Sequence, residues 1–252
     1  YATQHNMVFK NMRKRTRLDQ LLVEGGFFEN IEKAQFAIAS GMVKTDGQKI
    51  THTNALTNSN SVISITEQEK YVSRGGYKLE GFLKDIDANV KGKVAIDIGA
   101  STGGFTDCLM QAGVEKVYAV DVGHGQIAWK LRENHNVIVL EKQNARYKLS
   151  IDESVDIVVI DVSFISVLKI LPNVLPLMKN KSDIFVLVKP QFEAKKEDVP
   201  RGGVIDNPRI HAETLQNVSS WGRSNGLRVG GIRRSVITGA KGNVEFFINF
   251  QK

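Results

Sequence analysis

From residue 93 onward, the chain alternates between short apolar runs and stretches that carry apolar residues at helical spacing. Continuously apolar runs are typical of strands in a sheet that is covered on both faces. Five runs read as strands: "KVAIDIG", "EKVYAVDVG", "NVIVL", "SVDIVVIDVS" and "DIFVLVK". Their alternation with helices predicts an α/β fold with a mostly parallel sheet. Two last runs, "LRVGGIRRSVIT" and "NVEFFINF", predict a C-terminal antiparallel hairpin on the sheet edge.

The first part of the chain follows a different pattern. "RTRLDQLLVEGGFF" predicts a helix that ends at a glycine pair. "NIEKAQFAIASG" predicts a second helix, with Asn30 as N-cap and with Ile31, Ala34, Phe36 and Ile38 buried. "MVKTDGQKI" reads as a strand, an Asp-Gly turn and a second strand. Together these elements predict a small α+β domain.

These patterns divide the chain into four parts. Residues 1–12 are interpreted as a tag or a disordered arm, and residues 13–65 as the small α+β domain. Residues 66–76, "TEQEKYVSRGG", are polar and end in two glycines, which predicts a linker. Residues 77–252 form the large domain, which opens with the helical pattern "YKLEGFLKDI".

Composition and charge narrow the partners. The net charge of +7 favours an anionic partner, and a basic run within residues 10–17 suits either nucleic acid or a solvated tail. The single cysteine, Cys108, rules out an internal disulfide and suggests a reducing, cytoplasmic location. The histidines show no metal-ligand spacing, so no metal is predicted. No run is apolar enough to predict a membrane span.

The segment "VAIDIGASTGGFTDCL" reads as a strand, a glycine-rich turn and a helix. Its glycines, Gly99, Gly103 and Gly104, lack the G-x-G-x-x-G spacing, so an NAD-dependent oxidoreductase is disfavoured. The segment instead resembles the first motif of the Rossmann-like S-adenosylmethionine methyltransferases, in which an acidic residue, here Asp97, precedes G-x-x-x-G. Asp121 ends the next strand, where a carboxylate can accept the ribose hydroxyls of a nucleoside.

This resemblance implies S-adenosyl-L-methionine as the cofactor. Asn144 and Ala145 follow the third strand, where the edge of the adenine would lie. The predicted cofactor-binding residues are Asp97, Gly99, Ser101, Gly103, Gly104, Phe105, Asp121, Asn144, Ala145 and Asp161.

Two ionisable residues come directly after apolar strands. Asp161 ends the fourth strand and Lys189 ends the fifth, at the carboxyl ends where ligands of such sheets bind. If their strands are neighbours, the two side chains can meet. A purely structural ion pair is the alternative, but such a pair could lie at either end of the strands. The placement of both residues at the ligand end favours function.

Four positions resemble the K-D-K-E tetrad of the FtsJ-type ribose 2′-O-methyltransferases: Lys78, Asp161, Lys189 and Glu245. The phrases "SRGGYKLEG", "IDVSFIS", "VKPQFE" and "GNVEFF" resemble the TlyA family, which is also labelled hemolysin A. The resemblance implies methylation of a ribose 2′-hydroxyl in ribosomal RNA, at cytidine. It extends over nearly the whole chain from about Arg13.

The chemistry asks for these residue types. A ribose hydroxyl attacks a sulfonium methyl group only as its proton is removed or shared, and a lysine can take that proton only when its amine is neutral. Lys189 is predicted as the general base, Lys78 as the residue that positions the substrate, and Asp161 as the orienting group near the cofactor. The role of Glu245 is open.

The first domain resembles the S-four-like RNA-binding domain, on the residues Arg17, Leu18, Asp19, Leu22, Ala34, Ile38, Gly41, Val43 and Gly47. This resemblance implies that basic side chains meet the phosphates of a structured RNA, which gives affinity rather than sequence choice. A protein-docking module is the alternative. The predicted RNA-binding residues are Arg13, Lys14, Arg15, Arg17, Lys33, Lys44 and Arg74.

Three other functions compete with a ribose methyltransferase. A non-catalytic ribosome-assembly factor would keep the basic first domain but would not need the four tetrad residues. A pore-forming hemolysin would need a membrane-spanning segment. A base methyltransferase of the adenine type would carry N-P-P-[YF] after the fourth strand, where "DVSF" stands.

Overall fold

The computed structural model describes residues 15–66 and 69–252, which separate into two compact units at residues 1–70 and 71–252. Each unit is treated by itself. The predicted terminal arm, together with Arg13 and Lys14, lies outside the described residues.

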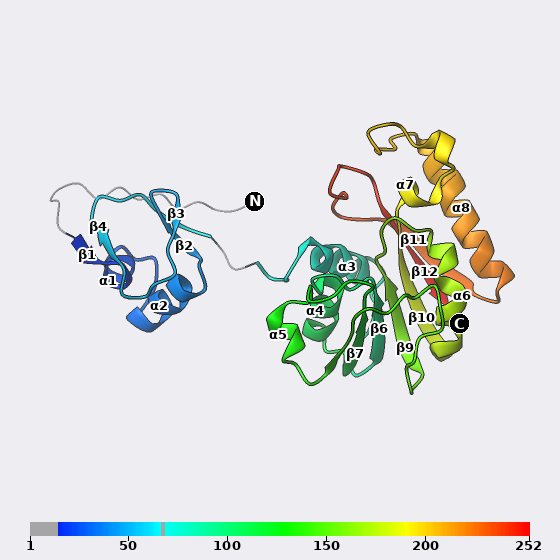
Figure 1. Cartoon of the computed structure of the whole chain (residues 1–252), viewed down its shortest axis with the longest axis horizontal. Coiled ribbons are helices and arrows are strands. Elements are labelled where there is room, and N and C mark those ends of the chain that lie inside the picture. The colour runs from blue at the N-terminus through cyan, green and yellow to red at the C-terminus, as the bar shows by residue number, and fades with distance from the viewer. Residues whose placement is uncertain (1–14, 67–68) are drawn as a thin grey trace. The chain divides into compact units, whose positions relative to one another are not determined.

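The first unit packs two helices beside short strands (Figure 1). Strands β3, β2 and β5 form one antiparallel sheet, and β1 pairs with β4. The helices and β2 enclose a core of leucine, isoleucine, valine and alanine side chains. The elements are β1 (Arg15–Arg17), α1 (Leu18–Glu24), α2 (Ile31–Ala39), β2 (Val43–Thr45), β3 (Gln48–Lys49), β4 (Leu56–Asn58) and β5 (Ile63–Ile65).

Helix α2 begins as predicted but buries a narrower face. The side chain of Asn30 accepts a hydrogen bond from the Lys33 amide, which confirms the N-cap. The predicted burial of Ile31 and Phe36 is wrong, since these residues are 43% and 62% exposed. Phe36 lies two positions from buried Ala34, which places it on the opposite side of a helix with 3.6 residues per turn. Ile31 stands in the first turn, at the end of the packed face.

The second unit is built on a seven-stranded sheet with the order β11-β12-β10-β9-β6-β7-β8. Strands β6 to β10 run parallel, and β12 runs antiparallel between β10 and β11. The predicted mostly parallel sheet and terminal hairpin are thereby confirmed. The strands are β6 (Val94–Ile98), β7 (Lys116–Val120), β8 (Val137–Leu140), β9 (Val155–Ile160), β10 (Met178–Val188), β11 (Arg228–Arg234) and β12 (Phe246–Gln251).

Helices cover both faces of this sheet (Figure 1). One face packs against α3, α4 and α5, and the other against α6 and α8. The helices are α3 (Arg74–Asp85), α4 (Gly104–Gln111), α5 (Trp129–Arg132), α6 (Leu171–Val174), α7 (Pro190–Glu193) and α8 (Pro208–Ser224), with short 3₁₀ turns at η1 (Val167–Lys169), η2 (Leu175–Leu177) and η3 (Lys196–Asp198). No helix within residues 15–66 and 69–252 is long and apolar enough to cross a membrane.

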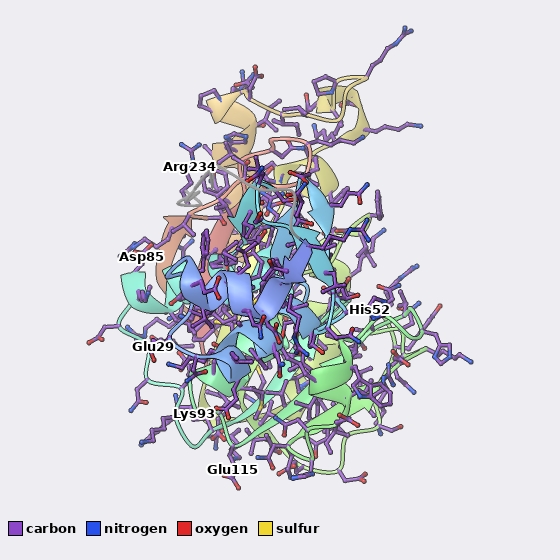
Figure 2. The ribbon with its side chains drawn as sticks, turned by 90° about the vertical axis from the view of Figure 1, so that its left-hand side faces the viewer. Glu29, His52, Asp85, Lys93, Glu115 and Arg234 are labelled. Carbon is purple, nitrogen blue, oxygen red and sulfur yellow. The ribbon has the colours of Figure 1, made fainter. Side chains whose placement is uncertain are left out.

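The two ends of the sheet are easily told apart. Lys93 and Glu115 precede β6 and β7 at one end, and Arg234 ends β11 at the other (Figure 2). Every residue of β6 is buried, as are the last four of β9 and the last five of β10. Apart from Asp97 in β6, these buried stretches hold apolar side chains, and the other polar groups lie toward the strand ends.

The segment before α3 belongs to the second unit. Tyr71 is buried, and the Val72 amide donates to the Asp107 carboxylate at 2.9 Å. Arg74 starts the first turn of α3, so the last three residues of the predicted linker 66–76 are helical. Their two glycines let α3 approach its neighbours: a Cβ atom on Gly76 would stand 2.2 Å from the Tyr71 ring. The pattern "RGG" was misread because glycine pairs usually mark flexible segments.

In the first unit, Asp19 connects α1 to β1 and to α2 through hydrogen bonds. It is fully buried and accepts hydrogen bonds from Arg17 at 2.6 and 3.1 Å and from the Gln35 side chain at 2.7 Å. The Arg17 guanidinium holds the pKa of Asp19 down, at about 2. We expect Asp19→Asn to lower the local unfolding free energy at pH 7 by about 1–2 kcal/mol, measured by amide hydrogen exchange of α1 and α2 in the intact chain.

The pH dependence gives this prediction a sign. A carboxylate with a lowered pKa stabilises the fold above its unfolded pKa of about 4, and the stabilisation is lost as pH falls toward 2. The loss of unfolding free energy in Asp19→Asn relative to the wild type should therefore become smaller as pH falls from about 4 toward 2. Glu29→Gln, which removes an exposed ion pair with Lys33, is the matched control and should have no measurable effect. An equal deficit at pH 7 and pH 3 would contradict the assignment.

Candidate active site

Two ion pairs between lysine and a carboxylate lie at the carboxyl end of the sheet. Lys78 Nζ is 2.6 Å from Glu245 Oε2, and their side chains are 10% and 3% exposed. Lys189 Nζ is 2.5 Å from Asp161 Oδ1, with exposures of 9% and 20%. Charges this far removed from water are found in proteins where they are paired, and here both pairs are formed.

The sheet explains why residues from four segments converge. Asp161 follows β9 and Lys189 follows β10, and these strands are parallel neighbours with Val186 opposite Ile160. Strand β12 runs the other way, with Phe246 opposite Val188, so Glu245 precedes its strand at the same end. The prediction that the strands of Asp161 and Lys189 are neighbours and that the two side chains meet is confirmed.

Lys78 reaches the site from α3. The helix buries Leu79, Phe82 and Leu83 against the sheet, and Lys78 stands beside them on the packed side. Gly81 allows Val236 to lie against the helix, since a Cβ atom there would be 2.6 Å from a Val236 methyl group. This contact brings the loop before Glu245 next to Lys78.

Three cavities adjoin these pairs, each named here after its position. The β7 cavity lies beyond the ends of β6, β7 and β8 and is lined by residues including Gly99, Asp121, Asn144 and Asp161. The central cavity is lined by residues including Arg74, Lys78, Ser101 and Lys189. The β12 cavity is lined by residues including Lys78, Gln191, Asn243 and Glu245. Asp161 lines both the β7 and the central cavity, and Lys78 and Lys189 line both the central and the β12 cavity. The ion pairs therefore lie where neighbouring cavities meet.

The β7 cavity combines one carboxylate with apolar walls. Asp121 accepts hydrogen bonds from the amides of Ser101 at 2.8 Å and Gly123 at 2.6 Å, and each carboxylate oxygen keeps a lone pair for a further donor. The apolar walls come from Val122, Ala145, Val162, Ile165 and Ile170. A carboxylate for vicinal hydroxyls beside apolar walls for a flat ring is the donor set that an adenosine requires.

Gly99 sets the distance between β6 and β9 at the cavity floor. Its φ is +85°, and a Cβ atom there would stand 2.4 Å from the Asp161 carbonyl oxygen. That space is too small for any side chain, and the left-handed backbone favours glycine as well. The loop after β6 can therefore pass close to Asp161.

Most predicted cofactor residues line these cavities, with two exceptions. Gly99, Ser101 and Asp161 line both the β7 and central cavities; Asp121, Asn144 and Ala145 line the β7 cavity; Gly104 and Phe105 line the central cavity. Gly103 and Asp97 line none of the three cavities. Gly103 adopts φ +95° as the N-cap of α4.

Asp97 ties the end of β6 to α4. It accepts hydrogen bonds from the Thr106 amide at 2.9 Å and the Thr106 hydroxyl at 2.7 Å, both on Oδ2. Its other oxygen is buried and has no hydrogen-bond partner among the described residues. Burial raises the pKa of Asp97 to about 7, and the nearby carboxylate of Asp161 adds to the rise.

The predicted RNA-binding residues that the structure describes differ in exposure and in whether their charge is paired with a carboxylate. Arg15 and Lys44 are exposed. Arg17 donates two hydrogen bonds to the Asp19 carboxylate, and Lys33 forms an ion pair with Glu29. Arg74 donates to the Thr238 carbonyl at 2.8 Å and lines the central cavity, so it helps to hold the loop before β12.

Several residues of the site were not predicted. Ser163 accepts a hydrogen bond from Lys189 Nζ at 3.1 Å, and Glu193 accepts from Ser166 and from the Val167 amide. Ser163 belongs to the quoted phrase "IDVSFIS", yet its spacing from Asp161 carried no sign of this contact. Within residues 15–66 and 69–252, no group of three or more candidate ligands could hold a metal ion.

Comparison with known proteins gives consistent matches. The family model of FtsJ-like methyltransferases matches residues 71–252. A proposed rRNA methyltransferase, YqxC of Bacillus subtilis, is 44% identical over 246 residues, which cover 94% of this chain and 85% of the relative. The 16S/23S rRNA (cytidine-2′-O)-methyltransferase TlyA of Mycobacterium tuberculosis is 39% identical over 241 residues, covering 94% and 90%. The solved structure of a proposed hemolysin from Streptococcus thermophilus matches with a TM-score of 0.71 at 36% identity, covering 96% of this chain and 90% of the other.

The raised pKa of Asp97 predicts a pH-dependent stability. A carboxyl whose pKa is about 4 when unfolded and about 7 when folded favours the fold below pH 4 and loses that contribution as pH rises through 7. Asn at this position has no proton to lose. We therefore expect the thermal unfolding midpoint of Asp97→Asn, measured relative to that of the wild type, to rise as the pH increases from 5 to 8. A constant difference across this range would show that Asp97 does not titrate there.

Proposed function

Because this chain belongs to the FtsJ-like methyltransferase family, we propose that it transfers a methyl group from S-adenosylmethionine to a ribose 2′-hydroxyl of ribosomal RNA, at a cytidine. The observation that carries this proposal is the pair of buried lysine–carboxylate contacts between two cavities. On one side lies a cavity suited to adenosine, and on the other lies the β12 cavity, open to a second substrate.

The β7 and central cavities together would hold the cofactor. Asp121 would accept the ribose hydroxyls, Asn144 and Ala145 would border the adenine, and the loop after Gly99 would run beside the amino-acid part. S-adenosylmethionine supplies an electrophilic methyl group on a sulfonium sulfur. Asp161 lines both cavities, and its negative charge suits a cation at their junction.

Lys189 is assigned as the general base. It lines the central and β12 cavities and thus lies between the proposed cofactor and the proposed substrate. In the step, the ribose oxygen forms a bond to the methyl carbon, the bond from that carbon to sulfur breaks, and the hydroxyl proton passes to the neutral amine of Lys189. Binding both reactants in line supplies much of the acceleration.

Lys78 and Glu245 would position the substrate. Glu245 accepts a hydrogen bond from Lys78 Nζ at 2.6 Å, so the cation is held in one orientation at the wall of the β12 cavity. A fixed cation there would orient the ribose or its phosphate. Glu245, whose role the sequence left open, is assigned as the partner that fixes Lys78.

The first unit would supply RNA affinity. Arg15 and Lys44 are exposed, and the chain carries a net charge of +7, which favours a polyanion. TlyA of Mycobacterium tuberculosis is named for action on both 16S and 23S rRNA, and we propose ribosomal RNA as the substrate class here. We expect the reaction in the cytoplasm, where ribosomes work.

Substitution of the proposed base tests the catalytic assignment. We expect Lys189→Ala to abolish transfer of tritium-labelled methyl groups to ribosomal RNA while the dissociation constant for S-adenosylmethionine changes by less than about threefold, because Lys189 acts on the proton and not on the cofactor. Lys179→Ala removes a lysine at the opposite end of β10 and is the matched control. Wild-type transfer by Lys189→Ala would refute the assignment.

Mapping 2′-O-methyl groups in ribosomal RNA from cells with and without this protein tests the reaction itself. A ribose methylation that depends on both the protein and Lys189 is expected. Methylation on a base would instead indicate a different acceptor, and no change in methylation would favour the non-catalytic assembly factor.

Gly99 offers a separate test of the cofactor site. Ala at this position would collide with the Asp161 carbonyl, so we expect Gly99→Ala to weaken S-adenosylmethionine binding at least tenfold in calorimetry. Gly92 also has a left-handed backbone, with φ +69°, but a Cβ atom there would meet nothing within 4 Å among the described residues other than its two chain neighbours. Gly92→Ala shares the backbone strain without the collision and should keep wild-type affinity. Equal affinities of both variants would place the cofactor elsewhere.

A further inference from the structure

The two lysines of the site are held in different ways. Lys78 makes a hydrogen bond and an ion pair with the same carboxylate, Glu245. Lys189 is 2.5 Å from Asp161 Oδ1, yet that oxygen has no hydrogen bond among the described residues, so the contact is an ion pair without hydrogen-bond geometry. The hydrogen bond of Lys189 Nζ goes to the Ser163 hydroxyl at 3.1 Å.

This difference matters for a base. A neutral lysine amine has two N–H bonds and one lone pair, and rotation about the last side-chain bond decides where the lone pair points. An ion pair depends mainly on distance, whereas a hydrogen bond depends on direction. The hydrogen bond to Ser163 therefore fixes one N–H bond, the nearby charge of Asp161 attracts the second, and the lone pair is left in the third direction.

We propose that Ser163 is a positioning residue that accepts a hydrogen bond from Lys189 and thereby directs the lone pair of the amine toward the substrate hydroxyl. The inference rests on the proposed function, in which Lys189 is the general base. The sequence assigns no role to Ser163, and the tetrad does not include it.

The location of Ser163 supports this role. It lines the β7, central and β12 cavities, and no other residue in the described part of the chain lines all three. The point where these spaces meet is where a methyl group would pass from the cofactor to the substrate.

The loop that carries Ser163 is anchored on both sides. Before it, the Asp161 amide donates to the Ile98 carbonyl at 3.0 Å. After it, Ser166 and the Val167 amide donate to the half-buried carboxylate of Glu193, at 2.5 and 2.7 Å. Between these anchors, Phe164 adopts φ +64°, a conformation that bulky residues rarely take and that persists where the surroundings enforce it. A hydroxyl on such a loop can serve as a fixed reference for a flexible lysine.

The test is a substitution series at this position. We expect Ser163→Ala to lower kcat for methyl transfer about tenfold, which corresponds to about 1.4 kcal/mol, one hydrogen bond. The KM for ribosomal RNA and the dissociation constant for S-adenosylmethionine should stay within about twofold, because the hydroxyl acts on the amine. Ser163→Thr keeps a hydroxyl and should restore kcat to within about threefold of wild type. Ser219→Ala removes a buried hydroxyl on α8 that has no hydrogen-bond partner among the described residues, and it should leave all constants unchanged.

Three outcomes would overturn the inference: wild-type kcat in Ser163→Ala, equal losses in the Ala and Thr variants, or a loss confined to cofactor affinity. Lys189→Ala, assayed alongside, separates this inference from the proposed function. If Lys189→Ala is inactive and Ser163→Ala is unaffected, the base assignment holds and the positioning role fails. If Lys189→Ala is fully active, the base assignment itself is wrong.

Discussion

The central strands of the second unit are buried on both faces, and this constraint decides where the chemistry can lie. The buried parts of β6, β9 and β10 carry mostly apolar side chains because helices cover the sheet on either side. Apart from Asp97, which accepts hydrogen bonds from Thr106, the buried parts of these strands carry no charge, and the other charged groups lie toward the strand ends. In a parallel sheet the carboxyl ends meet at one edge, so polar residues from separate strands are collected at a single place.

Charge balance shapes what is collected there. Two lysines and two carboxylates come together with little exposure, so the tetrad is neutral as a set. Each lysine has its own carboxylate, and the two contacts differ in geometry. A hydrogen-bonded pair suits a residue that must keep its charge and orientation, as proposed for Lys78. An ion pair without hydrogen-bond geometry leaves the Lys189 amine free to direct its protons elsewhere, as a proposed base requires.

The sequence was most informative where one physical rule dominates. Apolar runs predicted β6 to β10 because buried strands need such runs, and the strand-end rule brought Asp161 and Lys189 together. It failed where packing decides. Phe36 reads as a core residue from its hydrophobicity, but it lies on the wrong side of α2. The "RGG" segment reads as a linker, although its glycines serve close packing of α3.

The partners of the site residues were harder to predict. Lys78 and Glu245 are 167 residues apart, and their pairing depends on the antiparallel insertion of β12 beside β10. The resemblance to a known tetrad supplied both positions, but it did not say which carboxylate each lysine meets. Ser163 sits in an irregular loop, where no periodicity exists to indicate the direction of a side chain.

The insertion of β12 also bears on how the protein is made. Ribosomes synthesise the chain in order, and β12 fills a position between β10 and β11, both of which are made earlier. Until it arrives, β10 keeps a bare edge, Lys78 lacks its carboxylate, and the wall that Glu245 gives to the β12 cavity is missing. A nascent chain can thus have a complete cofactor-binding half without a working methyl-transfer centre, so catalytic competence has to wait until β12 is made.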